Sequence, residues 1–401
     1  MEEEKKYKKV SYWSVVWSQF KKNKIALWGL GAIVLLLLQA IYSPFLSLDV
    51  PIVYSIDGKM HCPFLLELFN KNRFENTVDI LFNAVMVVSP LLVALWFVCK
   101  KIFSISTNKT FVIFIAFVIL VCFAASIVSE KLVKIGNRKY KEEIAIAKSE
   151  GKKVSAIFPL MKWSYKETDL EGSNPQAPSA KHLLGTDSTG RDVLTRMLYG
   201  TRISMTIGVV AVSIYMLIGI VLGALAGYFG GAIDIWISRL IEVVICFPTF
   251  FLILTLAAFI EKRTVFHVMI LIGVVSWTGV ARLVRGEFLR QRGMDYVQAA
   301  IALGISRAKI IFTHILPNAM GPILVSATFG IASAILTESS LSFLGLGDPT
   351  APSWGGILNI GRQQGKLWLI LAPGFAIFFV VSVFNLVGEA IRDAMDPRLR
   401  Q

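Results

Sequence analysis

Long uninterrupted apolar segments make up most of the chain, and shorter polar segments separate them. A helix that crosses a bilayer needs about 20 mostly apolar residues. Eight segments have that length and pattern, so the sequence predicts an all-α, polytopic membrane protein. The predicted spans are residues 25–43, 80–99, 111–128, 203–227, 239–260, 265–281, 319–337 and 368–390.

Composition agrees with this pattern. Of the 401 residues, 55% are hydrophobic and 17% are charged, against about 45–50% and about 25% in soluble domains. These values disfavour a fully soluble enzyme and exclude a disordered or collagen-like chain. The formal charge of +14 suits the basic cytoplasmic loops of a membrane protein better than nucleic-acid binding, because the chain has no zinc-finger spacing. The four cysteines form no CxxC pair, so neither a disulfide framework nor a zinc site is expected.

The distribution of Lys and Arg predicts the orientation of the spans. A lysine-rich head precedes the first span and no small-residue cleavage site follows it, so we expect an uncleaved anchor with a cytoplasmic head. Alternation then places the basic loop 282–318 and the basic C-terminal tail inside, as the positive-inside rule requires. The short basic loop 261–264, outside in this scheme, is an exception.

Three glycines lie four residues apart in the predicted span 203–227: Gly219, Gly223 and Gly227. Such spacing lets two helices approach closely in lipid. It fits a sliding contact in a transporter, but ordinary packing is the favoured interpretation. Charged residues are almost absent at membrane depth, so we expect no proton relay in this chain.

The segment from Gly361 to Leu367 looks like a nucleotide-binding P-loop, but it is one residue short and lacks the Ser or Thr that holds Mg²⁺. It also falls on the predicted outer side. We therefore expect no ATP and no other cofactor to bind to this chain. His182, His267 and His314 are isolated in sequence, with no metal-ligand spacing.

The loop 282–318 is too long and too patterned for a simple connector. Asp295 can cap a short helix over 296–303, Gly304 suits the end of that helix, and Ser306 can cap a second helix through Thr313. Two short helices joined at a glycine form a knob that fits a partner's groove. An amphipathic hairpin lying on the lipid surface is the alternative, and the pattern leaves both open.

The residues from Asp295 to Asn318 closely resemble the EAA signature of ABC importer permeases, although Gln298 stands where Glu is usual and His314 where Ile is usual. The resemblance implies that this loop couples the spans to cytoplasmic ATPases. The residues it assigns to coupling are Asp295, Tyr296, Gln298, Ala299, Ala300, Gly304, Arg307, His314, Leu316 and Pro317.

Further segments resemble the oligopeptide/dipeptide "C" permeases, continuously from about residue 180 to the end and more thinly over 20–50; among them are 184–204, 227–231, 342–347 and 392–398. Residues 51–180 depart from the family pattern, since two extra spans lie where the family has one outer loop. This long insertion is similar to that of the YejE-like subgroup. Asp187, Arg191 and Asp192 fit a salt-bridged structural loop better than a contact with substrate.

The resemblance implies an ABC importer type I transmembrane domain in the bacterial inner membrane, with both termini cytoplasmic. It implies a peptide importer, not an enzyme, with a second permease subunit, an external peptide-binding protein and two ATPase subunits that hold ATP and Mg²⁺. The expected division is a cytoplasmic head 1–24, an anchor 25–43, an insertion 44–180, and a five-span core 181–401 containing the coupling loop 282–318.

Two other readings remain open. The substrate can be a peptide antibiotic, a lipid-like molecule or a metal complex, because the pocket is not readable from apolar spans. An intramembrane enzyme is the alternative from another class, but it needs HExxH, a GxSxG serine or twin aspartates at membrane depth, and the sequence has none of them.

Overall fold

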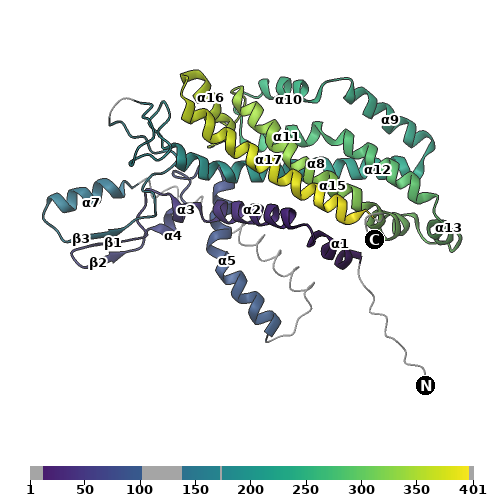
Figure 1. Ribbon diagram of the computed structural model, residues 1–401, viewed down its shortest axis with the longest axis horizontal. Helices are drawn as coiled ribbons and strands as arrows, with labels where there is room; N and C mark the ends of the chain where they lie inside the picture. Colours follow the sequence, from purple (N-terminus) through teal and green to yellow (C-terminus); the bar gives the residue numbers. More distant parts are fainter. Residues whose placement is uncertain (1–11, 102–137, 172–173, 397–401) are drawn as a thin grey trace. The chain divides into compact units, whose positions relative to one another are not determined.

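The computed structural model describes residues 12–101, 138–171 and 174–396 (Figure 1). Most of the described chain is helical. The N-terminal helices are α1 (Tyr12–Phe20), α2 (Lys24–Ile41), α3 (Ser43–Leu46), α4 (Phe64–Glu67), α5 (Thr77–Lys101) and α7 (Tyr140–Ser149). The later helices are α8 (Val193–Phe229), α9 (Gly231–Ile245), α10 (Thr249–Ala258), α11 (Val265–Val275), α12 (Trp277–Arg292), α13 (Asp295–Ala302), α14 (Arg307–Lys309), the π-helix η2 (Ile310–Ile315), α15 (Leu316–Phe343), α16 (Trp354–Gln364) and α17 (Leu367–Met395).

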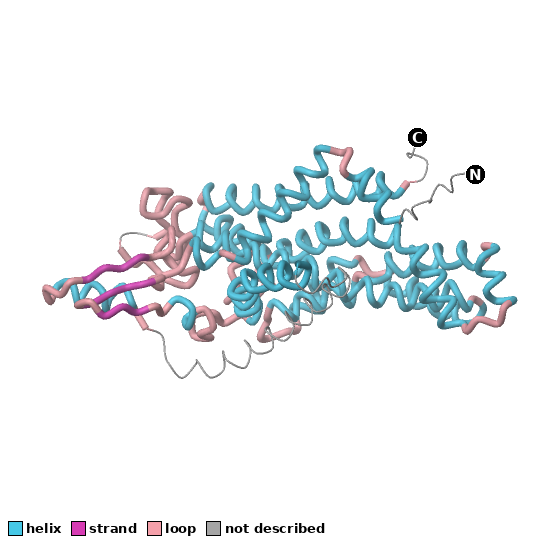
Figure 2. Tube along the Cα trace, turned by 90° about the horizontal axis from the view of Figure 1, so that it is seen from below, coloured by secondary structure: helices cyan, strands magenta, loops and turns pink. Residues whose placement is uncertain are grey.

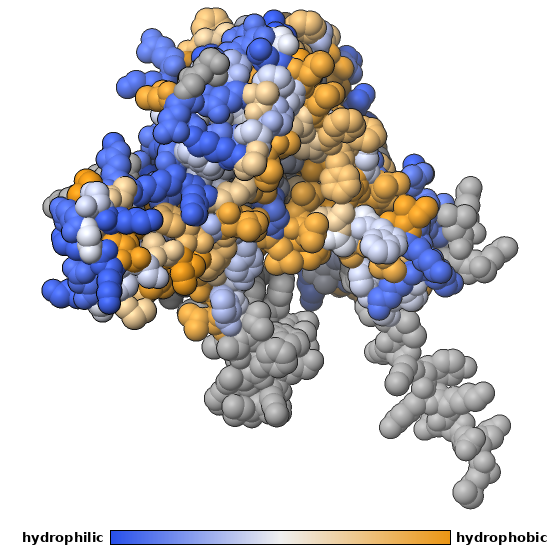
Figure 3. All heavy atoms as spheres, turned by 60° about the vertical axis from the view of Figure 1, so that its left-hand side comes forward, coloured by the Kyte–Doolittle hydropathy of each residue, from blue (hydrophilic) through white to orange (hydrophobic). Residues whose placement is uncertain are grey.

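Among the described residues, five helical segments are long and apolar enough to cross a membrane, and a bent pair of helices brings the number to six if it is counted as one span. The five are Lys24–Ile41, Val193–Phe229, Val265–Arg292, Arg307–Phe343 and Leu367–Met395. They cover five of the predicted spans. Their surfaces expose large apolar side chains, and Figure 3 shows hydrophobic residues gathered in broad continuous areas. Apolar surface of this extent marks contact with lipid or with another subunit.

The predicted span 239–260 is not a single straight helix. The chain forms α9 and α10 there, and the two helices are bent by 74° at the break between them. Pro248 occupies the N-cap position of α10. Proline lacks the N–H that would continue the first helix and restricts the residue before it, so the chain turns at this point.

The two extra spans predicted in the insertion have different outcomes. The helix α5 has 25 residues and covers the whole predicted range 80–99. The predicted span 111–128 lies outside the described residues.

The chain divides into two compact units, and each is described by itself. Unit 1 consists of residues 1–35, 207–338 and 377–401. Unit 2 consists of residues 36–206 and 339–376. The helices α2, α8, α15 and α17 contribute residues to both.

Unit 2 contains a small antiparallel sheet that the all-α prediction missed. Its three strands, β1 (Val53–Ile56), β2 (Lys59–His61) and β3 (Val154–Ile157), are ordered β2-β1-β3, and α7 lies beside them (Figures 1 and 2). The turn between β1 and β2 is Asp57-Gly58, with both φ angles positive. Asp-Gly favours that conformation and is a strong hairpin signal, so the hairpin was readable from the sequence.

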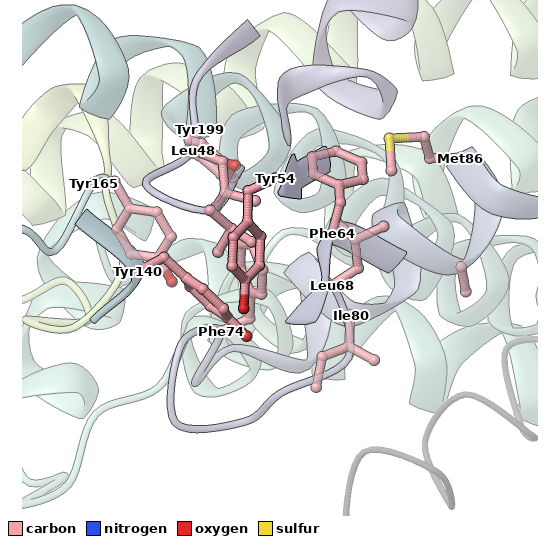
Figure 4. Packing of buried hydrophobic residues seen from close by; sticks show 12 residues of the cluster. Leu48, Tyr54, Phe64, Leu68, Phe74, Ile80, Met86, Tyr140, Tyr165 and Tyr199 are labelled. Atoms are coloured by element: carbon pink, nitrogen blue, oxygen red, sulfur yellow. The ribbon is translucent and has the colours of Figure 1, made fainter. Parts of the chain in front are cut away.

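Aromatic rings fill the core beneath this sheet. Tyr54 and Tyr140 meet edge to face with centroids 5.9 Å apart, and Tyr165 lies 4.9 Å from Tyr199. Figure 4 shows Phe74 among these rings. The rings come from β1, the loop before α5, α7, the loop before α8, and α8 itself. Their burial therefore ties the insertion to the first turns of α8 within one core.

A buried arginine also binds the insertion to α8. Arg202 is fully buried and donates to Asp79 Oδ1 at 3.1 Å, to Asn83 Oδ1 at 2.9 Å and to the carbonyl of Ala40 at 2.7 Å. A buried charge is costly unless it is paired and hydrogen-bonded, and here it is both. The guanidinium thus holds α2 and α5 against the start of α8 inside unit 2.

Candidate coupling surface

The helix α13 lies in unit 1, between α12 and the segment that leads into α15 (Figure 1). The prediction that Asp295 caps it is wrong by one residue. Met294 has the extended cap conformation, and its carbonyl accepts from the backbone N–H groups of Val297 and Gln298. Asp295 is the first helical residue, where its carboxylate favourably faces the positive end of the helix dipole.

A left-handed turn at Gly304 ends α13. Gly304 has φ +70°, its N–H donates to the carbonyl of Ile301, and the N–H of Ile305 donates to the carbonyl of Ala300. This pair of bonds is the Schellman arrangement, which satisfies the last carbonyls of a helix. The space around Gly304 is open, since an added Cβ would meet nothing within 4 Å. Only the backbone conformation requires glycine here.

The second predicted helix begins where expected but does not end at Thr313. Ser306 occupies the N-cap position of α14, although its side chain makes no capping hydrogen bond. The helix continues through η2 into α15, so that Arg307–Phe343 forms one helical segment. The segment after Gly304 is therefore the start of a membrane span and not a separate short helix.

Side-chain hydrogen bonds fix α13 to its two neighbours. Tyr296 Oη donates to Gln291 Oε1 of α12 at 2.7 Å, and Gln298 Nε2 donates to the carbonyl of Arg292 at 2.9 Å. On the other side, Asn318 Nδ2 of α15 lies 3.4 Å from Tyr296 Oη. The predicted residues Tyr296 and Gln298 thus have structural contacts, and α13 is linked to helices that run into two spans.

One side of α13 is buried and the other is exposed and apolar. Val297 and Ala300 face inward. We call the exposed side the coupling surface; it consists of Gln298, Ala299, Ile301, Ala302 and Leu303. Leu303 is 79% exposed and Ile301 is 45% exposed. Exposed large apolar side chains that lie together on a connecting segment are typical of a surface that contacts another subunit.

The remaining predicted residues lie at the base of the following span. Arg307 lines an apolar hollow of about 260 Å³ together with Phe312 and Leu316. His314 is half-buried in η2, and its Nε2 makes no hydrogen bond to any described residue. Pro317 is exposed and follows the π-helix η2 inside the continuous helical segment Arg307–Phe343. These residues lie outside the exposed side of α13, and their role in coupling stays a prediction.

The three spaced glycines all face α12. A Cβ on Gly219 would lie 2.7 Å from Val280, one on Gly223 would lie 2.6 Å from the carbonyl oxygen of Ala281, and one on Gly227 would lie 2.6 Å from Phe288. Real Cβ atoms do not approach so closely, so only glycine permits this contact. The helix that leads to α13 is therefore packed backbone to backbone against α8 in unit 1.

The loop before α8, in unit 2, holds a buried charge cluster that sequence reasoning missed. His182 is not isolated: its Nδ1 lies 2.8 Å from Asp192 Oδ2 and its Nε2 lies 3.1 Å from Asp169 Oδ2, with all three side chains buried. Burial opposes the charged carboxylate, but hydrogen bonds from Lys181 and His182 hold the pKa of Asp169 below its usual range. Spacing in sequence gave no signal, because the loop brings these residues together.

The other charged residues of that loop form structural pairs. Asp187 Oδ2 accepts from Arg191 Nε at 2.8 Å, and Arg196 Nε lies 3.8 Å away. Burial again opposes ionisation, yet the two arginines lower the pKa of Asp187. In the described residues, no group of three or more His, Cys, Asp or Glu side chains is arranged to hold a metal ion.

The P-loop-like segment has a different structure. Residues up to Gln364 belong to α16, and Gly365 ends that helix with φ +63° before α17 begins at Leu367. It forms a helix end and a tight turn, and not a loop around a phosphate.

Two family models and several transport permeases match this chain in sequence. Residues 219–401 match the family model described as a binding-protein-dependent transport system inner membrane component. Residues 11–57 match the N-terminal TM domain of oligopeptide transport permease C. The dipeptide transport system permease protein DppC of Alkalihalophilus pseudofirmus is 41% identical over 250 residues, which are 61% of this chain and 82% of that protein.

Two further relatives are similar at the same level. The oligopeptide transport system permease protein OppC of Haemophilus influenzae is 38% identical over 250 residues, covering 61% of this chain and 78% of that protein. The inner membrane ABC transporter permease protein YejE of Escherichia coli is 42% identical over 226 residues, covering 56% of this chain and 66% of that protein. Identity to YejE and to DppC is almost the same, so the YejE-like subgroup stays a prediction.

Proposed function

The chain belongs to the OppC/DppC-like family of ABC importer permeases, and from that membership we propose that it carries peptides inward as one of two permease subunits. In this proposal, a second permease completes the path. Two cytoplasmic ATPases bind and hydrolyse ATP, and an external binding protein delivers the peptide. The printed names of the relatives, which concern dipeptides and oligopeptides, support the substrate class.

The observation that carries the coupling proposal is the coupling surface itself. It combines an apolar exposed face with side-chain hydrogen bonds from Tyr296 and Gln298 to α12. A face of this kind fits a groove on an ATPase subunit, and its bonds to α12 give a rigid connection to the span. Coupling requires that this contact differ in free energy between the two states of the ATPase pair.

The basic residues around α13 support a cytoplasmic position for the coupling surface. Arg290 and Arg292 lie in the last turn of α12, and Arg307 and Lys309 follow Gly304. Cytoplasmic loops carry an excess of Lys and Arg. Together with the alternation of spans, this supports cytoplasmic termini and an outer position for the insertion 44–180.

Cysteine labelling tests that orientation. Cys62 is exposed in the insertion, so a membrane-impermeant maleimide is expected to label it in intact spheroplasts. A Leu303→Cys variant in a background without native cysteines is expected to react only after the membrane is permeabilised. The reverse pattern would overturn the proposed orientation.

The central experiment is purification of the tagged chain in mild detergent, together with peptide uptake by cells that depend on it. We expect a second permease and P-loop ATPases to co-purify. The variant Leu303→Glu is expected to lose the ATPases and the uptake, while the matched control Leu303→Met keeps both because it keeps an apolar side chain. ATPases that stay bound to Leu303→Glu would show that the coupling surface is elsewhere.

A further inference from the structure

A cavity of about 300 Å³ opens on unit 1, among α8, α11, α12 and α15. Its size lies at the lower end of ligand pockets. No charged side chain lines it, and hydroxyl groups are its main polar feature: Tyr215, Ser276, Ser326, Ser333 and Thr337. A hydroxyl both donates and accepts, so this lining can bond to the N–H and C=O groups of a peptide backbone.

The hydroxyls follow one face of α15. Ser326, Ser333 and Thr337 are seven and four residues apart, which places them on the same side of a helix with 3.6 residues per turn. Thr337 donates to the carbonyl of Ser333 at 2.9 Å, as hydroxyls on membrane helices commonly do. Ser326 and Ser333 donate no hydrogen bond to any described residue. Their hydroxyls are available to a ligand.

The opposite wall contains a break in a span. Ser276 separates α11 from α12, with φ −89° and ψ 4°, inside the segment Val265–Arg292. Non-helical backbone at membrane depth is tolerated where it is buried in protein or lines a watery cavity. Ser276 lines this cavity, which accounts for the position of the break.

Two glycines beside the cavity, Gly279 and Gly330, differ in the space that surrounds them. Gly279 lines the cavity, and a Cβ added there would meet nothing within 4 Å. This differs from the glycines of α8, which touch α12 closely. Gly330 behaves in the opposite way, because a Cβ there would overlap the hydroxyl of Tyr215. Glycine at 330 thus lets the Tyr215 hydroxyl reach the wall formed by α15.

We propose that this cavity is a binding site for the peptide backbone in the transport path, and that its uncharged hydroxyl lining passes peptides irrespective of side-chain charge. The inference rests on the proposed function and names the part of this chain that contacts substrate. Tyr215 and Phe329 supply apolar contacts for side chains. A fixed charge in this low-dielectric setting would select strongly among charged peptides, and the site has none.

The size test compares two glycines of α12. Gly279→Leu fills the cavity, and Gly286→Leu adds the same side chain to the same helix, also into open space, outside the lining. Cells that express each variant are given labelled Ala-Ala and labelled Phe-Phe. We expect Gly279→Leu to lower Phe-Phe uptake at least tenfold more than Ala-Ala uptake, and Gly286→Leu to leave the ratio unchanged.

The charge test uses Ser333, which is exposed in the cavity. Ser333→Asp is expected to raise the ratio of Lys-containing to Glu-containing dipeptide uptake at least tenfold, while Ser333→Ala leaves that ratio unchanged. A purely structural role for Ser333 would not move this ratio.

The outcomes separate the inference from the proposed function. Unchanged ratios in Gly279→Leu and Ser333→Asp, with normal uptake by the wild type, would overturn the cavity alone. Loss of the co-purifying second permease from Gly279→Leu would show that this face is a subunit contact and would also overturn it. Absence of all peptide uptake by the wild type would overturn the proposed function, and the cavity proposal with it.

Discussion

Two connecting segments of this permease are built by different means. The segment around α13 is held by backbone bonds and a few neutral side-chain hydrogen bonds, and it leaves Ile301 and Leu303 exposed. The loop before α8 buries charged groups, including His182, Asp187 and Asp192, and satisfies them within the chain. The first segment leaves apolar side chains exposed, while the second pairs its charged groups within the chain. The difference favours the α13 segment as the one that contacts another subunit in the proposed function.

The largest expected effect is a loss of peptide uptake, without a matching loss of protein stability, when the α13 segment is changed at Gly304. Gly304→Asp places a side chain at φ +70°, which costs about 1 kcal/mol of folding free energy, yet it meets no neighbouring atom. We expect peptide uptake to fall to background with near-normal amounts of protein in the membrane. Uptake by cells and quantitative blotting of membranes measure the two quantities.

The control for this variant is Gly293→Asp. Gly293 has φ −78° and is also exposed, so the same substitution there avoids the backbone strain. We expect it to retain most uptake. If Gly304→Asp disappeared from the membrane in proportion to its lost uptake, the coupling interpretation would fail and a folding defect would replace it.

The next largest effect concerns stability in the loop before α8. Asp187→Asn leaves Arg191 and Arg196 without their carboxylate, and breaking a buried pair in this way costs about 3–5 kcal/mol. The midpoint of thermal unfolding in detergent is expected to fall clearly. Asp348→Asn is the control, because Asp348 accepts two hydrogen bonds from Thr350 at an exposed site, as Asp187 does from Thr189. Equal shifts in the two variants would contradict the buried-pair argument.

The same residue gives a pH dependence with a definite sign. The folded pKa of Asp187 is lower than that of an unfolded aspartate, which is about 3.9. Its stabilisation is therefore fully present above that value and is lost as pH falls through the folded pKa. The difference in unfolding midpoint between wild type and Asp187→Asn should stay constant from neutral pH to mildly acidic pH and shrink only at strongly acidic pH. A change of this difference near neutral pH would contradict the assignment to Asp187.

A smaller effect is expected at the link between α12 and α13. Tyr296→Phe removes the 2.7 Å hydrogen bond to Gln291 and should cost about 0.5–1.5 kcal/mol of unfolding free energy. We expect reduced but measurable uptake, since Gln298 still bonds to Arg292. Tyr296→Ala, which also removes the ring, should reduce uptake further. Identical uptake by wild type and both variants would show that this link does not transmit motion.

The smallest effect distinguishes two serine caps. Ser306 makes no capping hydrogen bond, so Ser306→Ala should change the unfolding free energy by less than about 0.5 kcal/mol. The Ser353 hydroxyl accepts from the N–H of Gly356 at 3.0 Å, and Ser353→Ala should cost about 1 kcal/mol. Thermal unfolding of the two variants side by side measures the difference. A larger loss at Ser306 would show a bond that forms only with a partner.

Hydrophobic patterning predicted five of the spans correctly because each is a long uniform segment. It missed the bend at Pro248, since apolar composition continues across the proline. It also missed the three-stranded sheet, although Asp57-Gly58 between β1 and β2 is a hairpin signal. The long apolar segments of the chain drew the prediction toward helices alone.

In the candidate site, features that depend on neighbouring residues were predicted from the sequence, and features that depend on distant contacts were not. Gly304 was readable as a helix end because the signal is local. The partners of Gly219 and Gly223 on α12, and those of His182, depend on contacts between distant segments that no spacing reveals. The hydroxyls of the cavity are spread over α8, α15 and the residue between α11 and α12, so their meeting also required the structure.

The unbroken helical segment from Arg307 to Phe343 has a mechanical consequence. With a rise of about 1.5 Å per residue, its 37 residues form a rod of roughly 55 Å. One end begins three residues after Gly304, and the same rod carries Ser333 and Thr337. In a rigid helix, a displacement of either end along the axis also displaces the other end. In the proposed function, thermodynamic reciprocity requires that a peptide bound near Ser333 change the affinity of the ATPases for nucleotide by the same factor by which nucleotide changes the affinity for that peptide.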